Sequence, residues 1–270
     1  MIYIIFFTLY FLIALLIIFQ LILYGARPTK TLAWLLAIFT IPIGGILLYI
    51  ILGRNRRKQK LYGREKFEEI TEYLKKIENQ HTPVTSIEYN EHNKLIHMIT
   101  KNCGSAPSTE NNVTLLKNGY ATFIAIFNAL QAAKHFIHLE YYIFEEGKLA
   151  DELLELFKHK VKDGVMIRIL YDGIGSRSLS RTYIKKLKKI GVEIYSFLPI
   201  RFGQFLSSVN YRNHRKIIVI DNKIAFTGGI NVSDKYVIGD PTLGIWHDMH
   251  LQIEGPAVYS LQAIFLKTGI

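Results

Sequence analysis

The sequence has little cysteine and, over its first quarter, no acidic side chains. Its single cysteine, Cys103, rules out a disulfide within the chain and a zinc site built from cysteines. Residues 1–63 hold seven Lys and Arg residues and no acid, whereas residues 64–270 hold 26 basic and 22 acidic residues. Most of the net charge of +11 therefore lies outside the part expected to fold as a globular domain. A nucleic-acid-binding domain would carry its excess charge in the folded part, so we expect no nucleic-acid partner.

Two long stretches, residues 2–23 and 31–52, contain no charged side chain. A helix of that length spans about 33 Å, which covers a hydrocarbon core of about 30 Å. The first stretch lacks both the positive start and the small-residue cleavage site of a signal peptide. We expect residues 1–53 to form a hairpin of two transmembrane helices. The five basic residues within 54–60 favour a cytoplasmic position for the rest of the chain and contact with anionic lipids.

The remainder is expected to comprise a linker and one domain. Residues 54–112 contain the basic cluster, an amphipathic helical pattern over 64–79 and loop-forming residues over 100–112. From residue 113 to residue 270, helical patterns over 121–134, 149–162 and 179–189 alternate with extended patterns over 136–143, 165–171 and 192–197. This alternation is typical of an α/β fold, with a sheet covered by helices on both faces.

The residues that point to chemistry lie around a β-branched run over 217–220. We expect His214 to begin this strand, and alternation along it places His214 and Lys216 on one face with Arg215 opposite. A neutral imidazole can attack phosphorus or protonate a leaving oxygen. Lys216 and the amide of Asn231 can donate to the non-bridging oxygens of a phosphodiester. The set predicts phosphoryl chemistry.

The spacing of these residues matches a known signature. His-x-Lys-x4-Asp-x6-Gly-Gly-x-Asn runs from His214 to Asn231 and agrees with the phospholipase D superfamily at every fixed position. Further segments resemble bacterial cardiolipin synthases over nearly the whole chain; they include Arg27, Asn118 with Gly119, Tyr142 with Ile143, Asp172 and Trp246 to Asp248. The resemblance implies a phospholipase D-type domain with a mixed sheet, attached to a bacterial inner membrane.

The resemblance also implies a reaction. In that family a histidine takes the phosphatidyl group of one phosphatidylglycerol, and a hydroxyl of a second displaces it, giving cardiolipin and glycerol without a metal or other cofactor. By position, His214 is the expected nucleophile or general acid, and Lys216 and Asn231 bind the phosphoryl oxygens. Asp248 is expected to hold the histidine ring in one tautomer. The structural residues of the motif are expected to be Asp221, Gly228 and Gly229.

Other polar residues leave alternatives open. Asp172 ends a predicted strand, where it could line a pocket or serve the turn that follows. Arg212 could reach a phosphate or pack within the protein. His247 and His250 suggest a metal pair, but on a strand an offset of three places them on opposite faces, and we expect no metal.

The family resemblance covers only part of such an enzyme. Cardiolipin synthases are roughly twice as long and carry a second His-x-Lys signature, whereas this sequence has one. One imidazole cannot both attack and protonate the leaving group on the opposite side. The chain could therefore be a truncated, inactive product, a half that pairs with its own copy, or a half completed by a separate chain. We expect apolar surface near Val258, Leu261, Ile264 and Phe265 to be exposed where the missing half would have packed.

Three functions follow from these alternatives. The first is a membrane-bound phosphatidyltransferase of the cardiolipin synthase type. The second is a homodimeric phosphodiesterase or nuclease of the same superfamily, which the apolar hairpin and modest domain charge disfavour. The third is a non-catalytic membrane remnant.

Overall fold

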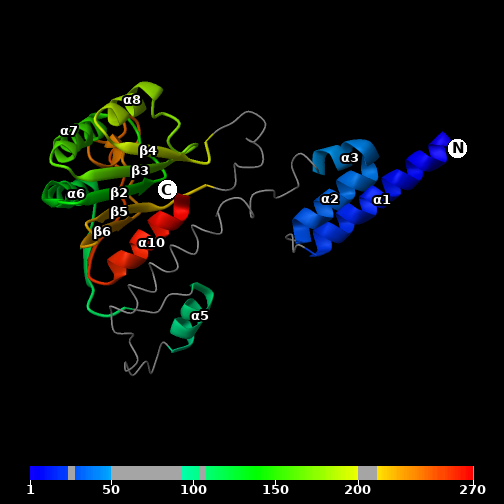
Figure 1. Ribbon diagram of the computed structural model, residues 1–270, viewed down its shortest axis with the longest axis horizontal. Helices are drawn as coiled ribbons and strands as arrows, with labels where there is room; N and C mark the ends of the chain where they lie inside the picture. Colours follow the sequence, from blue (N-terminus) through cyan, green and yellow to red (C-terminus); the bar gives the residue numbers. More distant parts are fainter. Residues whose placement is uncertain (24–27, 50–92, 104–107, 200–211, 270) are drawn as a thin grey trace. The chain divides into compact units, whose positions relative to one another are not determined.

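The computed structural model describes residues 1–23, 28–49, 93–103, 108–199 and 212–269, and the chain divides into two compact units (Figure 1). The first unit contains α1 (Ile2–Leu23), α2 (Pro28–Thr40) and α3 (Pro42–Leu48). The second unit contains every described strand and the other described helices.

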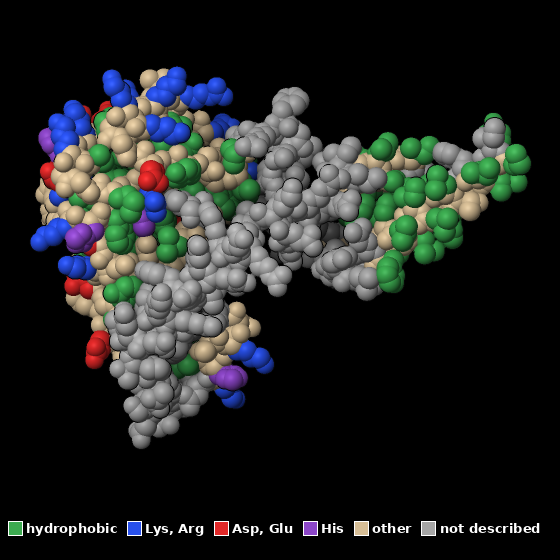
Figure 2. Space-filling view, in the orientation of Figure 1, with side chains coloured by type: hydrophobic (Ala, Val, Ile, Leu, Met, Phe, Trp, Pro, Cys, Tyr) green, Lys and Arg blue, Asp and Glu red, His purple; other side chains and the backbone are tan. Residues whose placement is uncertain are grey.

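The first unit has a small apolar core of its own. Ala14 and Ile17 pack with Ile38 and Tyr49, and most other described side chains of the unit are exposed and hydrophobic (Figure 2). The stretch expected as one span over 31–52 is divided, because α2 ends at Thr40 and α3 begins at Pro42, which has no N–H to continue the preceding helix. Over the residues that the structure describes, no helix is long and apolar enough to cross a membrane.

The linker is described only in part. α5 (Asn93–Cys103) includes the first residues of the expected 100–112 loop, which are helical instead. The amphipathic helix expected over 64–79 lies outside the described residues.

The second unit is built on one seven-stranded mixed sheet in the order β1-β7-β6-β5-β2-β3-β4. β2, β3 and β4 are parallel, and the other pairings are antiparallel. The strands are β1 (Asn112–Leu116), β2 (Phe136–Tyr141), β3 (Met166–Asp172), β4 (Glu193–Phe197), β5 (Lys216–Ile220), β6 (Ile224–Gly228) and β7 (His250–Glu254). The alternation of helices and strands predicted from the sequence is confirmed, whereas β1 was not foreseen.

Helices cover both faces of this sheet. α6 (Gly119–Ala132), α7 (Lys148–Lys162) and α8 (Arg181–Lys189) share one core with inward residues of the central strands. α10 (Ala257–Gly269) covers the other face, where Ile217 and Val219 pack with Val258. Val258 and Phe265 are both 0% exposed and Leu261 and Ile264 are half-buried, so the expectation of exposed apolar surface there is wrong. The helix buries these side chains against its own sheet.

The topology brings several loops to one edge of the sheet, which we call the site edge. β2 and β3 end there, β6 ends there at Gly228, and β5 and β7 begin there at Lys216 and His250. Lys216 pairs with Tyr141 and Gly228 pairs with His250. Extending the β5–β6 register by one residue places Lys216 beside Gly228, so one row crosses the sheet from Tyr141 to His250. The residues of the signature that precede or follow these strand ends meet at this edge.

Candidate active site

His214 lies at the site edge with an exposed side chain that rests on an aromatic ring. Its imidazole stacks on Tyr142, with 3.6 Å between the ring centroids and an interplanar angle of 19°. The Lys216 ammonium lies 5.4 Å from the centroid of the same Tyr142 ring and donates a 2.8 Å hydrogen bond to the His214 carbonyl. β5 begins at Lys216 rather than at His214. The structure therefore brings the imidazole and the ammonium to one ring, although only the lysine is in the strand.

Two opposing effects act on the pKa of Lys216. Burial lowers the pKa of Lys216 below its usual range, and the nearby Asp248 carboxylate opposes that shift. A cation that is partly removed from water interacts more strongly with an anion than a fully hydrated one. Lys216 is thus suited to meet a phosphoryl oxygen at the site edge.

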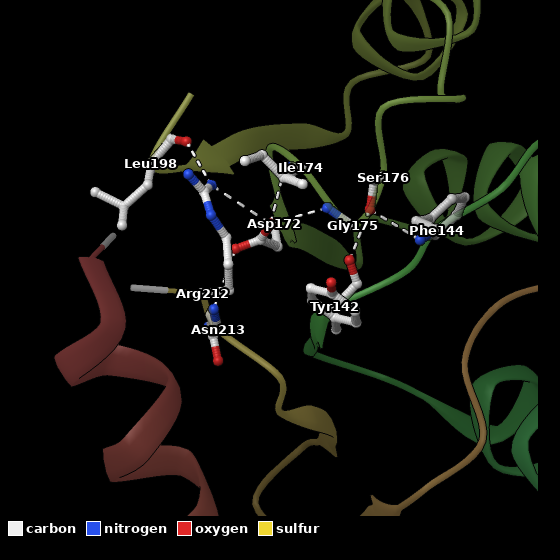
Figure 3. A network of polar contacts seen from close by, with 9 residues as sticks. All are labelled: Tyr142, Phe144, Asp172, Ile174, Gly175, Ser176, Leu198, Arg212 and Asn213. Carbon is white, nitrogen blue, oxygen red and sulfur yellow. Dashed lines mark hydrogen bonds and ion pairs between the residues drawn. The ribbon is translucent and has the colours of Figure 1, made fainter. Parts of the chain in front are cut away.

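The segment before His214 is held by the buried carboxylate of Asp172 (Figure 3). Its Oδ1 accepts backbone N–H groups of Ile174 and Gly175 at 2.8 and 2.9 Å, and its Oδ2 accepts the N–H of Asn213 at 3.1 Å. One carboxylate thus ties the turn after β3 to the residue that precedes His214. These three contacts bury Asp172 among the backbone N–H groups of the turn after β3 and of Asn213.

Arg212 completes this network from the same segment. Its Nη1 lies 3.6 Å from Asp172 Oδ1 and donates to the Leu198 carbonyl at 3.1 Å (Figure 3). The two side chains are 6% and 0% exposed, so Arg212 is packed within the protein in this state. This contact between a buried guanidinium and a buried carboxylate holds the segment that precedes His214.

Ser176 supports Tyr142, the residue on whose ring His214 stacks. Its hydroxyl donates to the Tyr142 carbonyl at 3.0 Å and accepts the Phe144 N–H at 2.9 Å (Figure 3). A side chain at Gly175 would overlap the Tyr142 carbonyl and lie 2.7 Å from its ring carbons. Glycine at this position therefore lets Tyr142 pack against the turn after β3.

A second buried carboxylate, Glu140, reaches the same segment from the α10 face of the sheet. Glu140 is 0% exposed, and its Oε1 accepts a 2.5 Å hydrogen bond from Asn213 Nδ2. Arg215 Nη1 lies 3.7 Å from that oxygen. Burial raises the pKa of Glu140, and the Asn213 hydrogen bond and the Arg215 charge act in the opposite direction. The residues on either side of His214 are thus both tied to one buried acid.

Tyr142, Glu140 and Asn213 are not among the site residues predicted from the sequence. Tyr142 was noted only within a matching segment, and Glu140 lies in a strand pattern that gives no sign of its partners. Asn213 directly precedes the histidine, and a polar side chain at that position was the signal that could have drawn attention to it.

Asn231 is buried beneath the site edge. Its Oδ1 accepts the Ile143 N–H at 3.1 Å, and its Nδ2 donates to the Tyr236 hydroxyl at 3.1 Å. Tyr236 belongs to the short helix η2 (Asp234–Tyr236). Because an amide nitrogen carries two hydrogens, these contacts leave Asn231 with a further donor.

Gly228 and Gly229 are required by close approach of the segment before β7. A Cβ at Gly228 would lie 2.7 Å from His250 Nδ1 and 2.6 Å from the Met249 carbonyl oxygen. A Cβ at Gly229 would overlap the Asp248 carboxylate. The two glycines therefore let Asp248 and His250 pack directly against the turn that leads to Asn231.

Asp248 and His250 differ in exposure. The Asp248 side chain is exposed and its Oδ1 accepts the Met249 N–H at 2.7 Å. Among the described residues no hydrogen bond joins Asp248 to the His214 ring, and its orienting role stays a prediction. His250 is 1% exposed, its ring nitrogens have no hydrogen-bond partner in the described part of the chain, and burial lowers its pKa to about 4.

Asp221 lies at the opposite edge of the sheet, past the end of β5. Its carboxylate accepts the backbone N–H groups of Lys134, His135 and Phe136 at 2.7 to 2.9 Å. Burial alone would raise the pKa of Asp221, but the three backbone donors outweigh it and lower the pKa below the usual range. These contacts close the start of β2 against the end of β5, away from His214.

The spacing of His247 and His250 suggested a metal pair, although no metal is expected from the sequence. Within the described ranges, no group of three His, Cys, Asp or Glu side chains could hold a metal ion. His247 is exposed while His250 is buried.

Comparisons with known proteins agree with the motif. The family model described as "Cardiolipin synthase, PLD-like domain" matches residues 126–265, and that described as "Phospholipase_D-nuclease N-terminal" matches residues 9–54. The chain therefore belongs to the cardiolipin synthase family of phospholipase D-like proteins.

Individual relatives are similar over most of this chain but not over most of their own. Cardiolipin synthase 1 of Bacillus cereus is 39% identical over 251 residues, which are 92% of this chain and 49% of that protein. Cardiolipin synthase of Halalkalibacterium halodurans is 40% identical over 244 residues, 89% of this chain and 48% of that protein. The chain spans about half the length of these curated relatives. Among solved structures, NucT from Helicobacter pylori is 16% identical with a TM-score of 0.47, over 59% of this chain and 96% of that one.

Proposed function

We propose that the chain supplies the first half of a phosphatidyltransferase site that makes cardiolipin and glycerol from two phosphatidylglycerol molecules. The observation that carries the proposal is the pairing of His214 and Lys216 on the Tyr142 ring at the site edge. An exposed imidazole there can reach a phosphorus atom, and the adjacent ammonium can stabilise the charge that develops on its oxygens. Membership of the cardiolipin synthase family supports the choice of lipid.

The proposed reaction has two displacements. A ring nitrogen of His214 attacks phosphorus, the phosphorus–oxygen bond to the headgroup glycerol breaks, and the departing oxygen takes a proton from a second histidine. A headgroup hydroxyl of another phosphatidylglycerol then attacks the same phosphorus, gives its proton to that second histidine, and releases His214. No cofactor is needed, and atoms balance as two phosphatidylglycerol giving cardiolipin and glycerol.

The other site residues support these steps by binding and placement. Lys216 and the remaining Asn231 N–H donate to non-bridging oxygens, where each such donor is worth about 3–4 kcal/mol in the transition state. Asp172 and Glu140 hold the backbone around His214, because each accepts a hydrogen bond from Asn213. Asp248 balances the charge near Lys216.

The second histidine must come from outside the described site. We propose that it is supplied by a second catalytic half, either on a separate chain or on a copy of this one. A copy would form the pair by two-fold symmetry.

We also propose that residues 1–53 anchor the chain in a bacterial cell membrane as a hairpin, with residues 54–270 in the cytoplasm. The family match over residues 9–54 and the exposed apolar side chains of the first unit support this attachment. The absence of acids and the five basic residues within 54–60 support the orientation. Labelling of Ser178→Cys, in a Cys103→Ser background, by an impermeant reagent on intact cells would contradict it.

The catalytic proposal is tested in a bacterial host that lacks its own cardiolipin synthases. The full chain is expressed alone and together with the second half of the Bacillus cereus relative, and lipids are measured by mass spectrometry. If the second half is a separate chain, cardiolipin should form only from the pair, because a missing general acid lowers the rate about 10²- to 10⁴-fold. His214→Ala should abolish it, and His247→Ala, at an exposed histidine, should not.

Each other outcome assigns a different function. Cardiolipin from the chain alone, lost with His214→Ala, would establish a working homodimer. Cleavage of DNA by the purified chain would favour a nuclease. No cardiolipin from either arm, with both chains present in the membrane, would contradict the proposal.

A further inference from the structure

The loop over residues 237–249 joins η2 to β7 at the site edge and exposes an unusual amount of apolar surface. Four large side chains are more than half exposed: Ile238 at 57%, Leu243 at 73%, Ile245 at 52% and Met249 at 56%. No charged residue occurs between Asp240 and Asp248. Burying one such side chain is worth about 1.5–3 kcal/mol, so this loop gains considerably from an apolar surrounding.

The exposure is built into an ordered turn. Asp240 and Gly244 exchange two backbone hydrogen bonds of 2.7 and 2.9 Å. The Asp240 carboxylate accepts the N–H groups of Thr242 and Leu243, at 2.9 and 3.2 Å, and the Thr242 hydroxyl at 2.7 Å. Leu243 is therefore held at the tip of a closed turn and cannot fold back onto the domain without breaking these bonds.

The base of the loop is attached to the candidate active site. Trp246 donates its N–H to the Lys235 carbonyl at 3.0 Å and packs edge-on against Tyr236, whose hydroxyl accepts from Asn231. At the other end, Gly229 donates to the Met249 carbonyl at 2.9 Å. The position of the tip relative to the signature residues is thus fixed by direct contacts.

We propose that this loop inserts Leu243 and its apolar neighbours among the acyl chains of a membrane, and so docks the site edge on the lipid surface. This inference rests on the proposed function, in which the reacting phosphorus belongs to a membrane lipid. The phosphate of such a lipid lies in the headgroup layer, above the acyl chains, so an apolar tip on a loop whose base is held at the site edge is placed to enter the layer beneath. The first unit of the same chain exposes apolar side chains along α1, which support the proposed membrane anchor, and such an anchor would supply the bilayer.

A protein partner is the other possible occupant. A second catalytic half or a second copy would bury the tip in a dry interface, as apolar interface cores are buried. We favour lipid because the four side chains lie along a narrow, closed turn and its flanks.

The test reads the surroundings of the tip directly in the full chain. Leu243→Cys is made in a Cys103→Ser background, labelled with an environment-sensitive nitrobenzoxadiazole dye, and reconstituted in vesicles of equal parts phosphatidylglycerol and phosphatidylcholine. Some vesicles carry nitroxide groups on the acyl chains, which quench the dye only at short range. Met166→Cys is the matched control, since Met166 is also apolar and exposed, at 40%, but begins β3 at the opposite edge of the sheet.

We expect blue-shifted emission and several-fold stronger nitroxide quenching at residue 243 than at residue 166. Equal, weak quenching at both positions with water-like emission would overturn the proposal. Blue-shifted emission at 243 without quenching by lipid nitroxide would overturn it too, and would assign the loop to a protein interface.

The readout does not depend on catalysis. Acyl-chain quenching at residue 243 in a chain that makes no cardiolipin, even with a second half, would retain the docking surface and reject the proposed reaction. Cardiolipin synthesis without acyl-chain quenching at residue 243 would retain the proposed reaction and reject the docking surface.

Discussion

At both edges of the sheet, buried or partly buried carboxylates hold segments of the chain together, but only at one edge does a held segment carry an exposed catalytic candidate. At the far edge, Asp221 accepts three backbone N–H groups and closes the joint between β5 and β2. At the site edge, Asp172 and Glu140 bind the segment around His214 yet leave the imidazole itself exposed. In the structure the aspartate of the signature contacts backbone far from the histidine, whereas two acids outside the signature contact the segment next to it.

Asp172→Ala should have the largest effect on stability. It removes the acceptor of three backbone donors and the partner of Arg212 at 3.6 Å. Unsatisfied buried donors and a broken buried pair predict a loss of about 3–5 kcal/mol in the free energy of unfolding. Urea unfolding followed by tryptophan fluorescence measures this loss, with Asp172→Asn, which keeps one acceptor, as a milder control. If Asp172→Ala lowers the free energy of unfolding no more than Asp221→Asn does, the contacts at the site edge do not contribute more to stability than those at the far edge.

Acid should weaken the domain through its buried histidines. Burial lowers the pKa of both His250 and His138 from 6.5 to about 4. The unfolded chain therefore takes up these protons first, and stability that is complete above pH 6.5 is lost as the pH falls toward 4. Each histidine contributes up to about 3 kcal/mol to that loss.

His250→Leu tests this at the site edge. Because both His250 ring nitrogens have no hydrogen-bond partner among the described residues, the substitution should cost little at pH 7. The difference in unfolding free energy between pH 7 and pH 5 should become smaller than in the unmodified chain. An unchanged pH dependence would show that His250 is not buried in neutral form.

Asp221→Asn should have a moderate effect confined to the far edge. Three backbone donors lower the pKa of Asp221, so its contribution is present above its unfolded pKa and is lost as the pH falls through the lower folded pKa. At pH 7 the amide leaves at least one donor unsatisfied, which predicts a loss of about 1–3 kcal/mol. Below pH of about 4 the difference from the unmodified chain should shrink. The His214 ring signals in NMR should not move, and a shift there would break the separation of the two edges.

Much of this fold could be predicted because its signals are local. Short β-branched, extended runs located β2 to β5 within a few residues, and helical spacing located α6 to α8. β1 was missed, since most of its side chains are exposed and the strand with which it pairs, β7, follows about 140 residues later in the chain. The burial of α10 against the sheet depends on contacts that no local pattern reveals.

The candidate site, too, could be predicted where its signals are local and could not where they depend on contacts between distant residues. Spacing alone identified His214, Lys216 and Asn231, because the signature lies within one hairpin. Glu140 and Tyr142 come from a strand that joins β5 only in the folded sheet, and periodicity cannot distinguish a buried acid with partners from an isolated polar residue. Asp172 was recognised as a turn residue, but its bond to Asn213 joins residues 41 positions apart.

Tyr142 gives the smallest and most specific test of the comparison. If the ring presents His214, then Tyr142→Leu should change the free energy of unfolding by only about 0.5–1.5 kcal/mol, the value of an aromatic pair. It should nevertheless move the His214 ring protons downfield in NMR, because the stacked ring at 3.6 Å that shields them is removed. Tyr142→Phe keeps the ring and should keep both the shift and the stability. Identical His214 signals in the Leu and Phe variants would show that the imidazole is presented by Asp172 and Glu140 alone, without the aromatic platform.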